Sequence, residues 1–137
     1  MAYEIESTIV HDFPYLKIRW DPVSKSVIMH WLRFAGEEEF KKALDAGLDL
    51  LIKNKTPNWI ADMRGMKVVP QEVQDWSNNN WFPRAIKGGV RNMALIVPSS
   101  VMAGITVKKI MNKVGSENIN TQYYEDPIKG QEWISSL

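Results

Sequence analysis

The chain contains no cysteine and only two histidines, His11 and His30. Thiol catalysis, disulfide scaffolds and cysteine-ligated zinc are therefore excluded, because each depends on a cysteine sulfur. Two histidines also argue against a multi-histidine metal site. The glycine-rich phosphate-binding patterns GxxxxGK[ST] and GxGxxG are missing as well. We therefore expect no metal and no bound cofactor.

An excess of charge of one sign is also missing. Seventeen Lys and Arg residues balance sixteen Asp and Glu residues, which gives a formal net charge of +1. This balance gives no support to a nucleic-acid groove or to an anionic membrane as partner. No apolar run approaches the roughly 20 residues of a membrane span. The N-terminal sequence MAYEIEST lacks the regions of a signal peptide, so we expect a soluble, cytoplasmic protein.

The chain does have the composition of one ordinary globular domain. Its 137 residues are 45% hydrophobic and 24% charged, and single domains commonly contain about 100–150 residues. It shows no internal repeat, low-complexity tract or linker. A chain of this size buries roughly two thirds of its unfolded surface, so it needs neither a metal nor a disulfide to fold. We expect one domain that spans residues 1–137.

The first part of the chain predicts strands followed by a helix. Tyr3–Val10 has the composition of a strand, and His11–Pro14 is expected to break it. Residues 15–32 form two strand-like segments around a turn at Asp21–Lys25, which predicts an antiparallel hairpin. Gly36–Lys53 repeats apolar residues at the i, i+3, i+4 spacing of one helix face.

The second part alternates strands and helices. Strands are predicted at Asn58–Met63, Asn92–Val97 and Thr121–Tyr124. Helices are expected to begin near Pro70, Ser100 and Asp126, since proline suits a first helical turn and the other two side chains can cap one. Ser77-Asn78-Asn79-Asn80 is poor helix material, and Phe82-Pro83 and Gly88-Gly89 indicate an irregular connection.

Strands that alternate with helices imply parallel crossovers, which are almost always right-handed. The predicted fold is therefore α/β. We expect a mixed sheet with an antiparallel N-terminal hairpin, right-handed parallel β-α-β crossovers, and helices packed on the sheet.

The element order, with the segments WIADMR, VQDW, PRA and MALIVP, resembles the small bacterial STAS-like proteins. STAS domains are the fold of anti-sigma-factor antagonists and of sulfate-transporter tails, and compact versions have been compared with lipid-binding domains. The resemblance covers about residues 15–137 and is most specific at Trp59–Arg64, Trp76 and Pro83-Arg84. It implies a non-enzymatic regulatory or protein-interaction domain, although a fold does not fix an activity.

One feature of that family is missing from this chain. In the antagonists, a serine or threonine after the corresponding strand is phosphorylated to switch partner binding. The loop here, Arg64–Pro70, contains no hydroxyl residue. The resemblance therefore does not extend to a phosphorylation switch.

Asp62 and Arg64 form the polar part of the candidate site. They lie where the strand at Asn58–Met63 ends, and ligands of such sheets tend to bind beyond the carboxyl ends of the parallel strands. Two residues apart on an extended chain, their side chains point to the same side. Three interpretations stay open: a pair that orients a carboxylate or phosphate ligand, a structural ion pair, and an Asp62 side chain that caps the amides of the following loop.

Trp76, Trp81, Phe82 and Arg84 form the rest of the candidate site. Aromatic side chains combine a large apolar area with a defined geometry, which suits a binding pocket. We expect Trp76 to anchor its helix in the core, which should also contain Met63, Met66, Met93, Met102 and Met111. Trp81 and Phe82 fit equally a buried plug and an exposed pair, which would form a pocket wall or a partner interface.

Three functional hypotheses follow. The first is a non-enzymatic interaction domain that contacts a protein partner or forms a homodimer through Trp81 and Phe82, with Arg64 and Arg84 binding an acidic group. The second is a protein that binds a small apolar ligand or a lipid, although 137 residues leave little core to spare for a cavity. The third, an enzyme with Asp62 as base and Arg64 as electrostatic clamp, is disfavoured because the sequence shows no assembled catalytic motif.

Overall fold

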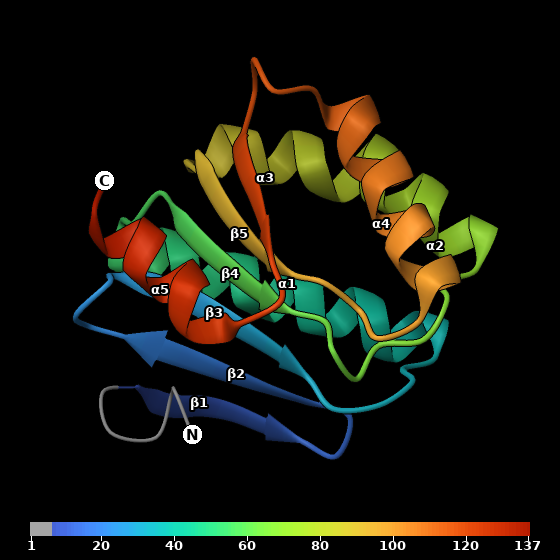
Figure 1. The fold of residues 1–137 in the computed structure, drawn as a ribbon, viewed down its shortest axis with the longest axis horizontal. Helices are drawn as coiled ribbons and strands as arrows, with labels where there is room; N and C mark the ends of the chain where they lie inside the picture. The colour runs from blue at the N-terminus through green and yellow to red at the C-terminus, as the bar shows by residue number, and fades with distance from the viewer. Residues whose placement is uncertain (1–6) are drawn as a thin grey trace.

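In the computed structural model, residues 7–137 are described, and they form a six-stranded mixed sheet with helices on both faces (Figure 1). The strands are β1 (Thr8–Phe13), β2 (Leu16–Asp21), β3 (Ser26–Trp31), β4 (Asn58–Asp62), β5 (Asn92–Ile96) and β6 (Asn120–Tyr124). They lie side by side in chain order. β1, β2 and β3 are antiparallel neighbours, and β3 to β6 are parallel. The predicted fold class is confirmed.

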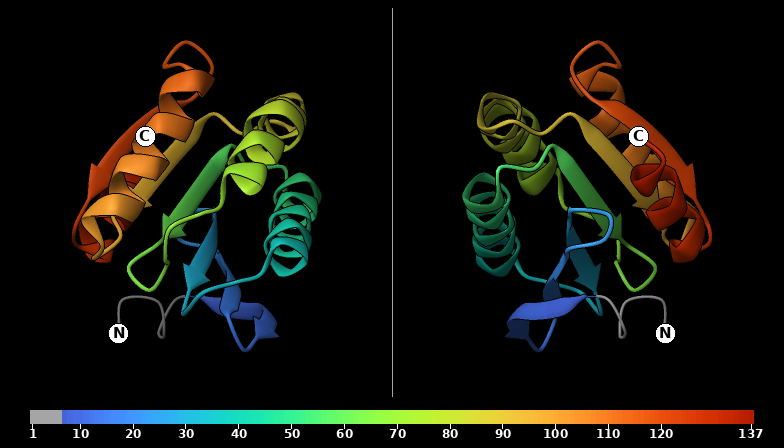
Figure 2. Two further views of the ribbon diagram at one scale, coloured as in Figure 1. Left: turned by 90° about the vertical axis from the view of Figure 1, so that its right-hand side faces the viewer. Right: turned by 90° about the vertical axis from the view of Figure 1, so that its left-hand side faces the viewer.

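The helical segments are α1 (Glu37–Asn54), α2 (Gln71–Trp76), η1 (Ser77–Trp81), α3 (Phe82–Gly88), α4 (Val101–Val114) and α5 (Pro127–Ser135). Each parallel crossover joins a strand to its next neighbour, always toward the same edge of the sheet. Right-handed connections of this kind place their helices on the same face of the sheet. α1, the continuous helix α2–η1–α3, and α4 therefore cover one face, which we call the helix-covered face (Figure 2). α5 packs on the other, which we call the α5 face.

The alternation of side chains along the strands divides the apolar residues between two cores. Trp59 and Ala61 of β4 point into the large core under the helix-covered face, whereas Ile60 belongs to a smaller core beneath Ile134 of α5. Asp62 alternates with Ala61 and therefore lies on the α5 face. The same strand thus supplies an apolar surface to one layer and a carboxylate to the other.

The predicted helix starts at Ser100 and Asp126 are confirmed by their hydrogen bonds. Oγ of Ser100 accepts a hydrogen bond from the backbone N–H of Ala103 at 3.3 Å. Oδ1 of Asp126 accepts one from the backbone N–H of Ile128 at 2.9 Å. Each cap satisfies a backbone donor that the first helical turn leaves without a partner.

The segment His11–Phe13 differs from the sequence prediction. It continues β1 instead of breaking it, because its residues pair with Ile18, Lys17 and Leu16 of β2. The break comes at Pro14-Tyr15, which form the turn between the two strands. The predicted strand Tyr3–Val10 lies partly outside the described residues, and β1 begins at Thr8.

The expected irregular connection is wrong for residues 77–83 but right at Gly88-Gly89, where α3 ends and Gly89 has a positive φ. The chain is helical from Gln71 to Gly88 and includes a π-helical turn at Ser77–Trp81. The low helix propensity of asparagine is offset by side-chain bonds. Nδ2 of Asn78 donates a hydrogen bond to the carbonyl oxygen of Ile110 in α4 at 3.0 Å.

Candidate functional site

Asp62 and Arg64 form a bidentate ion pair on the α5 face. Nη2 of Arg64 donates to Oδ2 of Asp62 at 2.6 Å, and Nε donates to Oδ1 at 2.9 Å. The Asp62 side chain is fully buried, whereas the Arg64 side chain is 44% exposed. The Nε/Nη2 edge of the guanidinium is thus bonded to Asp62. This geometry matches the structural ion pair, and the backbone N–H of Arg64 also donates to Oδ1 of Asp62 at 3.3 Å, as expected if Asp62 caps the loop.

His30 lies beside this pair, with its Nε2 atom 3.7 Å from Oδ2 of Asp62. Burial lowers the pKa of His30 more than the Asp62 carboxylate raises it, and the positive charges of Arg19, Arg64 and Lys17 lower it further. We therefore take the imidazole to be neutral near pH 7. The enzyme hypothesis gains no support, because both carboxylate oxygens of its proposed base accept hydrogen bonds from Arg64.

Trp76 and Arg84 lie at a different place, on the outer side of the seam between α1 and the helix α2–η1–α3. Nη2 of Arg84 donates to Oδ1 of Asp45 in α1 at 2.7 Å, and its Nε donates to Oδ1 of Asn80 at 2.9 Å. The Arg84 guanidinium carbon is 5.9 Å from the centre of a Trp76 ring. Trp76 is half-buried and packs against the core, as expected.

Trp81 and Phe82 are buried, with exposed fractions of only 1% and 8%. The indole N–H of Trp81 donates to the carbonyl oxygen of Leu44 in α1 at 2.9 Å. Its ring makes edge-to-face contacts with Trp59 and Phe82, with ring centres 5.0 and 4.9 Å apart. Of the two possibilities left open by the sequence, the exposed pair is therefore wrong. The six predicted site residues do not form one surface.

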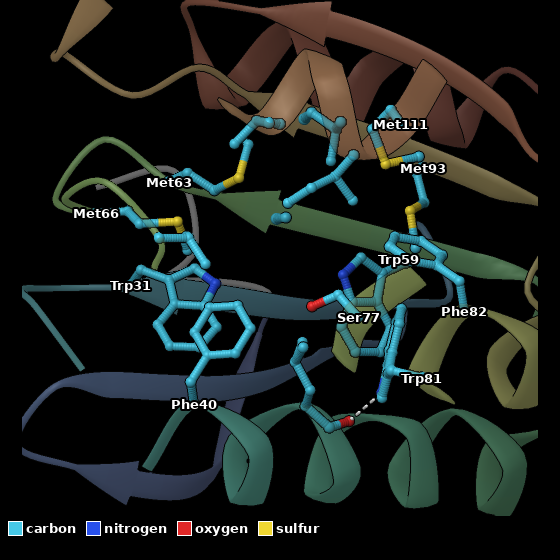
Figure 3. A pocket seen from close by; sticks show the side chains of 16 residues that line it. Trp31, Phe40, Trp59, Met63, Met66, Ser77, Trp81, Phe82, Met93 and Met111 are labelled. Carbon is cyan, nitrogen blue, oxygen red and sulfur yellow. Dashed lines mark hydrogen bonds between the residues drawn. The ribbon is translucent and has the colours of Figure 1, made fainter. Parts of the chain in front are cut away.

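Trp81 and Phe82 instead line an apolar cavity of ≈ 80 Å³ between the sheet and the helices of the helix-covered face (Figure 3). Trp31 stacks on Phe40 at one end of the cavity, with ring centres 5.0 Å apart. Trp59, Trp81 and Phe82 form the other end. Four methionines complete much of the wall: Met63, Met66, Met93 and Met111. Ligand pockets in proteins have this mostly apolar, aromatic-rich composition.

A few polar groups interrupt the apolar wall. Ser77 of the π-helical turn places its hydroxyl between the two aromatic groups (Figure 3), and its Oγ donates to the carbonyl oxygen of Val73 at 2.8 Å. Trp31 and Trp59 are 3% and 2% exposed. Neither indole N–H donates a hydrogen bond to any group in residues 7–137. Figure 3 shows the nitrogen of Trp31 turned toward the cavity.

The cavity unites residues that are distant in the sequence. Trp31 ends β3, Trp59 lies in β4, and Met111 belongs to α4. Of the lining residues, only Trp81 and Phe82 were predicted from the sequence to belong to a site, and the methionines were expected to fill the core. The signal available in the sequence was composition, since the chain contains six tryptophans and seven methionines. Composition does not show which of these side chains surround a space.

Within residues 7–137, no three histidine, aspartate or glutamate side chains gather as a metal site requires. None of the described helices combines the length and the apolar character needed to cross a bilayer. The chain matches no protein-family model, and comparisons with curated proteins and with solved structures find no match. The STAS-like resemblance stays a prediction.

Proposed function

We propose that this protein binds a small apolar molecule, about the size of one substituted aromatic ring, in the cavity beneath α1, η1 and α4. The observation that supports this proposal is an apolar space of ≈ 80 Å³ walled by five aromatic side chains and four methionines. An apolar cavity of about 150 Å³ in another protein stays dry and binds benzene. The smaller space here requires some expansion, which flexible methionine side chains allow.

The cavity carries a cost in stability. Protein interiors are normally close-packed, so the side chains around an unfilled apolar space of ≈ 80 Å³ lack dispersion contacts that a filled core would provide. A bound ligand would provide part of these contacts. The π-helical turn that contributes Ser77 and Trp81 supports the same proposal, since such turns are frequent at functional sites.

The indole N–H groups of Trp31 and Trp59 define the preferred ligand further. Neither N–H is sealed off without a partner, so each can be reached by a molecule in the cavity, where a hydrogen bond contributes about 0.5–1.5 kcal/mol. A ligand with a carbonyl or ether oxygen can accept a hydrogen bond from one of these groups, whereas a pure hydrocarbon cannot. We therefore propose an aromatic or alicyclic molecule with a hydrogen-bond acceptor as the ligand class.

The competing hypothesis, an interaction domain, depends on residues that are not available to a partner. Trp81 and Phe82 are buried, and Arg64 and Arg84 bind Asp62 and Asp45 within the chain. The cavity supports the ligand-binding hypothesis more directly.

The test compares acetophenone with α-methylstyrene, a hydrocarbon of similar shape in which a CH₂ group replaces the carbonyl oxygen. We expect acetophenone to bind with a Kd on the order of 1 mM or below, measured by calorimetry. Trp31→Phe keeps an aromatic ring but removes the donor. It should weaken acetophenone binding by up to about tenfold, the equivalent of one hydrogen bond, and leave α-methylstyrene binding nearly unchanged.

Trp76→Phe is the matched control, since Trp76 does not line the cavity, and it should bind both probes like the wild type. Failure of both probes to bind the wild-type protein would contradict the proposed function. Equal weakening of the two probes by Trp31→Phe would contradict the role of the indole donor.

A further inference from the structure

The outer face of α4 exposes large apolar side chains. Val101, Met102 and Ile105 are 78%, 63% and 56% exposed. The opposite side of the same helix is buried, and Val107 and Ile110 line the cavity there. Met102 was expected to fill the core and does not. An ordinary amphipathic helix presents polar residues to solvent, so the first turns of α4 depart from that pattern.

Lysines continue this face toward the end of α4. Lys108, Lys109 and Lys113 are all exposed, and they surround a surface hollow beside Ile105. At about 100° per residue, these lysines and the three exposed apolar residues fall within an arc of about 140°. We call these six residues the α4 surface.

The α4 surface is locally basic although the whole chain is nearly neutral. The sequence of α4, VMAGITVKKIMNKV, contains no Asp or Glu. None of its three lysines forms an ion pair with another residue in the range 7–137. Lys108 places its Nζ atom 5.6 Å from the ring centre of Tyr123. The positive charge of the helix is therefore not neutralised by neighbouring carboxylates.

The loop that precedes α2 also carries exposed apolar and basic side chains. Val68 is 45% exposed and follows the exposed Lys67. Oγ of Ser99, two residues before α4, donates to the carbonyl oxygen of Arg64 at 3.3 Å, which holds the two segments together. Figure 1 shows this loop beside the start of α4. Two segments that carry exposed apolar and basic side chains thus lie next to each other.

We propose that the α4 surface docks on a membrane that contains anionic lipids. Val101, Met102 and Ile105 would insert among the lipid headgroups, and the lysines would contact their phosphates. Apolar residues next to lysines on one helix face are the features that bind such surfaces. The positive charge of α4 favours a membrane with anionic lipids over a neutral membrane. The docking does not depend on the identity of the cavity ligand.

The test is co-sedimentation of the full chain with vesicles of phosphatidylcholine, with or without phosphatidylglycerol. We expect binding to the anionic vesicles only, and weaker binding as the salt concentration rises, because salt screens exposed charges. Met102→Glu should weaken binding by about tenfold or more, since it removes one inserted apolar side chain. Lys109→Gln should weaken it by about fivefold.

Ile128→Glu is the matched control, because Ile128 is 50% exposed on α5 and lies outside the α4 surface. Its binding should equal that of the wild type, and thermal unfolding confirms that each variant folds. Absence of vesicle binding, equal binding to both vesicle types, or full binding by Met102→Glu would overturn the proposal. Self-association in light scattering that Met102→Glu abolishes would also overturn it, since a second copy would then cover the surface.

Discussion

Arg64 and Arg84 should differ in how much stability is lost when each is replaced by alanine. Arg64→Ala deprives the fully buried carboxylate of Asp62 of its bidentate donor, and breaking a buried pair in this way costs about 3 kcal/mol. Arg84→Ala affects Asp45, whose side chain is 47% exposed, so the expected cost is below about 1 kcal/mol. Urea unfolding of both variants measures the difference. Equal losses would contradict the structural role assigned to the Asp62–Arg64 pair.

The buried imidazole of His30 predicts a pH dependence of stability. Its pKa is lowered below the ordinary value of 6.5, chiefly by burial. Between the lowered pKa and 6.5, the unfolded chain binds more protons than the folded protein, so the free energy of unfolding rises with pH there. We expect the free energy of unfolding to fall as the pH drops below about 6.5. Over the same pH interval, the free energy of unfolding of His30→Gln should fall less than that of the wild type.

The imidazole interacts electrostatically with Asp62, Arg64, Arg19 and Lys17. The variants are therefore compared by how steeply the free energy of unfolding changes with pH, and not by its value at one pH. His11→Gln, at the exposed second histidine, is measured in parallel as a control for the substitution itself. A His30→Gln variant with the wild-type slope would show that His30 is not the group responsible.

At the scale of elements, the π-helical turn at Ser77–Trp81 offers a direct test of the link between helix geometry and the cavity. Deletion of the exposed Asn79 should convert the π turn to regular α-helix, because a π turn holds one residue more than an α turn. We expect a folded protein of equal or greater stability in which acetophenone binds more weakly. Thermal unfolding and calorimetry measure the two effects.

Deletion of Asp75 is the control for this experiment. Asp75 is exposed and lies in the regular helix α2, so its loss rotates all later residues by about 100°. Trp81 would then leave the buried face, and the variant should be strongly destabilised. If deletion of Asn79 destabilised the protein as much as deletion of Asp75, the π turn would not be an insertion in an otherwise regular helix.

Helices and strands were predictable from the sequence where the pattern that specifies them lies within a few neighbouring residues. The Ser100 and Asp126 caps and the period-2 hairpin at residues 15–32 depend on neighbouring residues, and the structure confirms them. The asparagine run was not predictable in this way. Asn78 is held in a helix by a bond to Ile110, which lies 32 positions later.

At the scale of the molecule, the topology was predictable and the site was not. Alternating strands and helices restrict the fold through the rules on connections. A cavity, in contrast, is a space left between side chains from several elements, and no local pattern encodes it. The chain length suggested little core to spare, yet the structure has a cavity of ≈ 80 Å³. The net charge of +1 likewise gave no indication of the lysines that gather on α4.

The six indole N–H groups provide the most direct measurement of the central claim, that the cavity binds a small apolar molecule with a hydrogen-bond acceptor. A ¹⁵N-labelled sample titrated with acetophenone reports on all of them in one NMR spectrum. Trp31, Trp59 and Trp81 line the cavity, whereas Trp20, Trp76 and Trp133 do not. We predict large, saturable shifts of the Trp31 and Trp59 signals and almost none for the three outside the cavity. Shifts of similar size at all six, or none at Trp31 and Trp59, would contradict it.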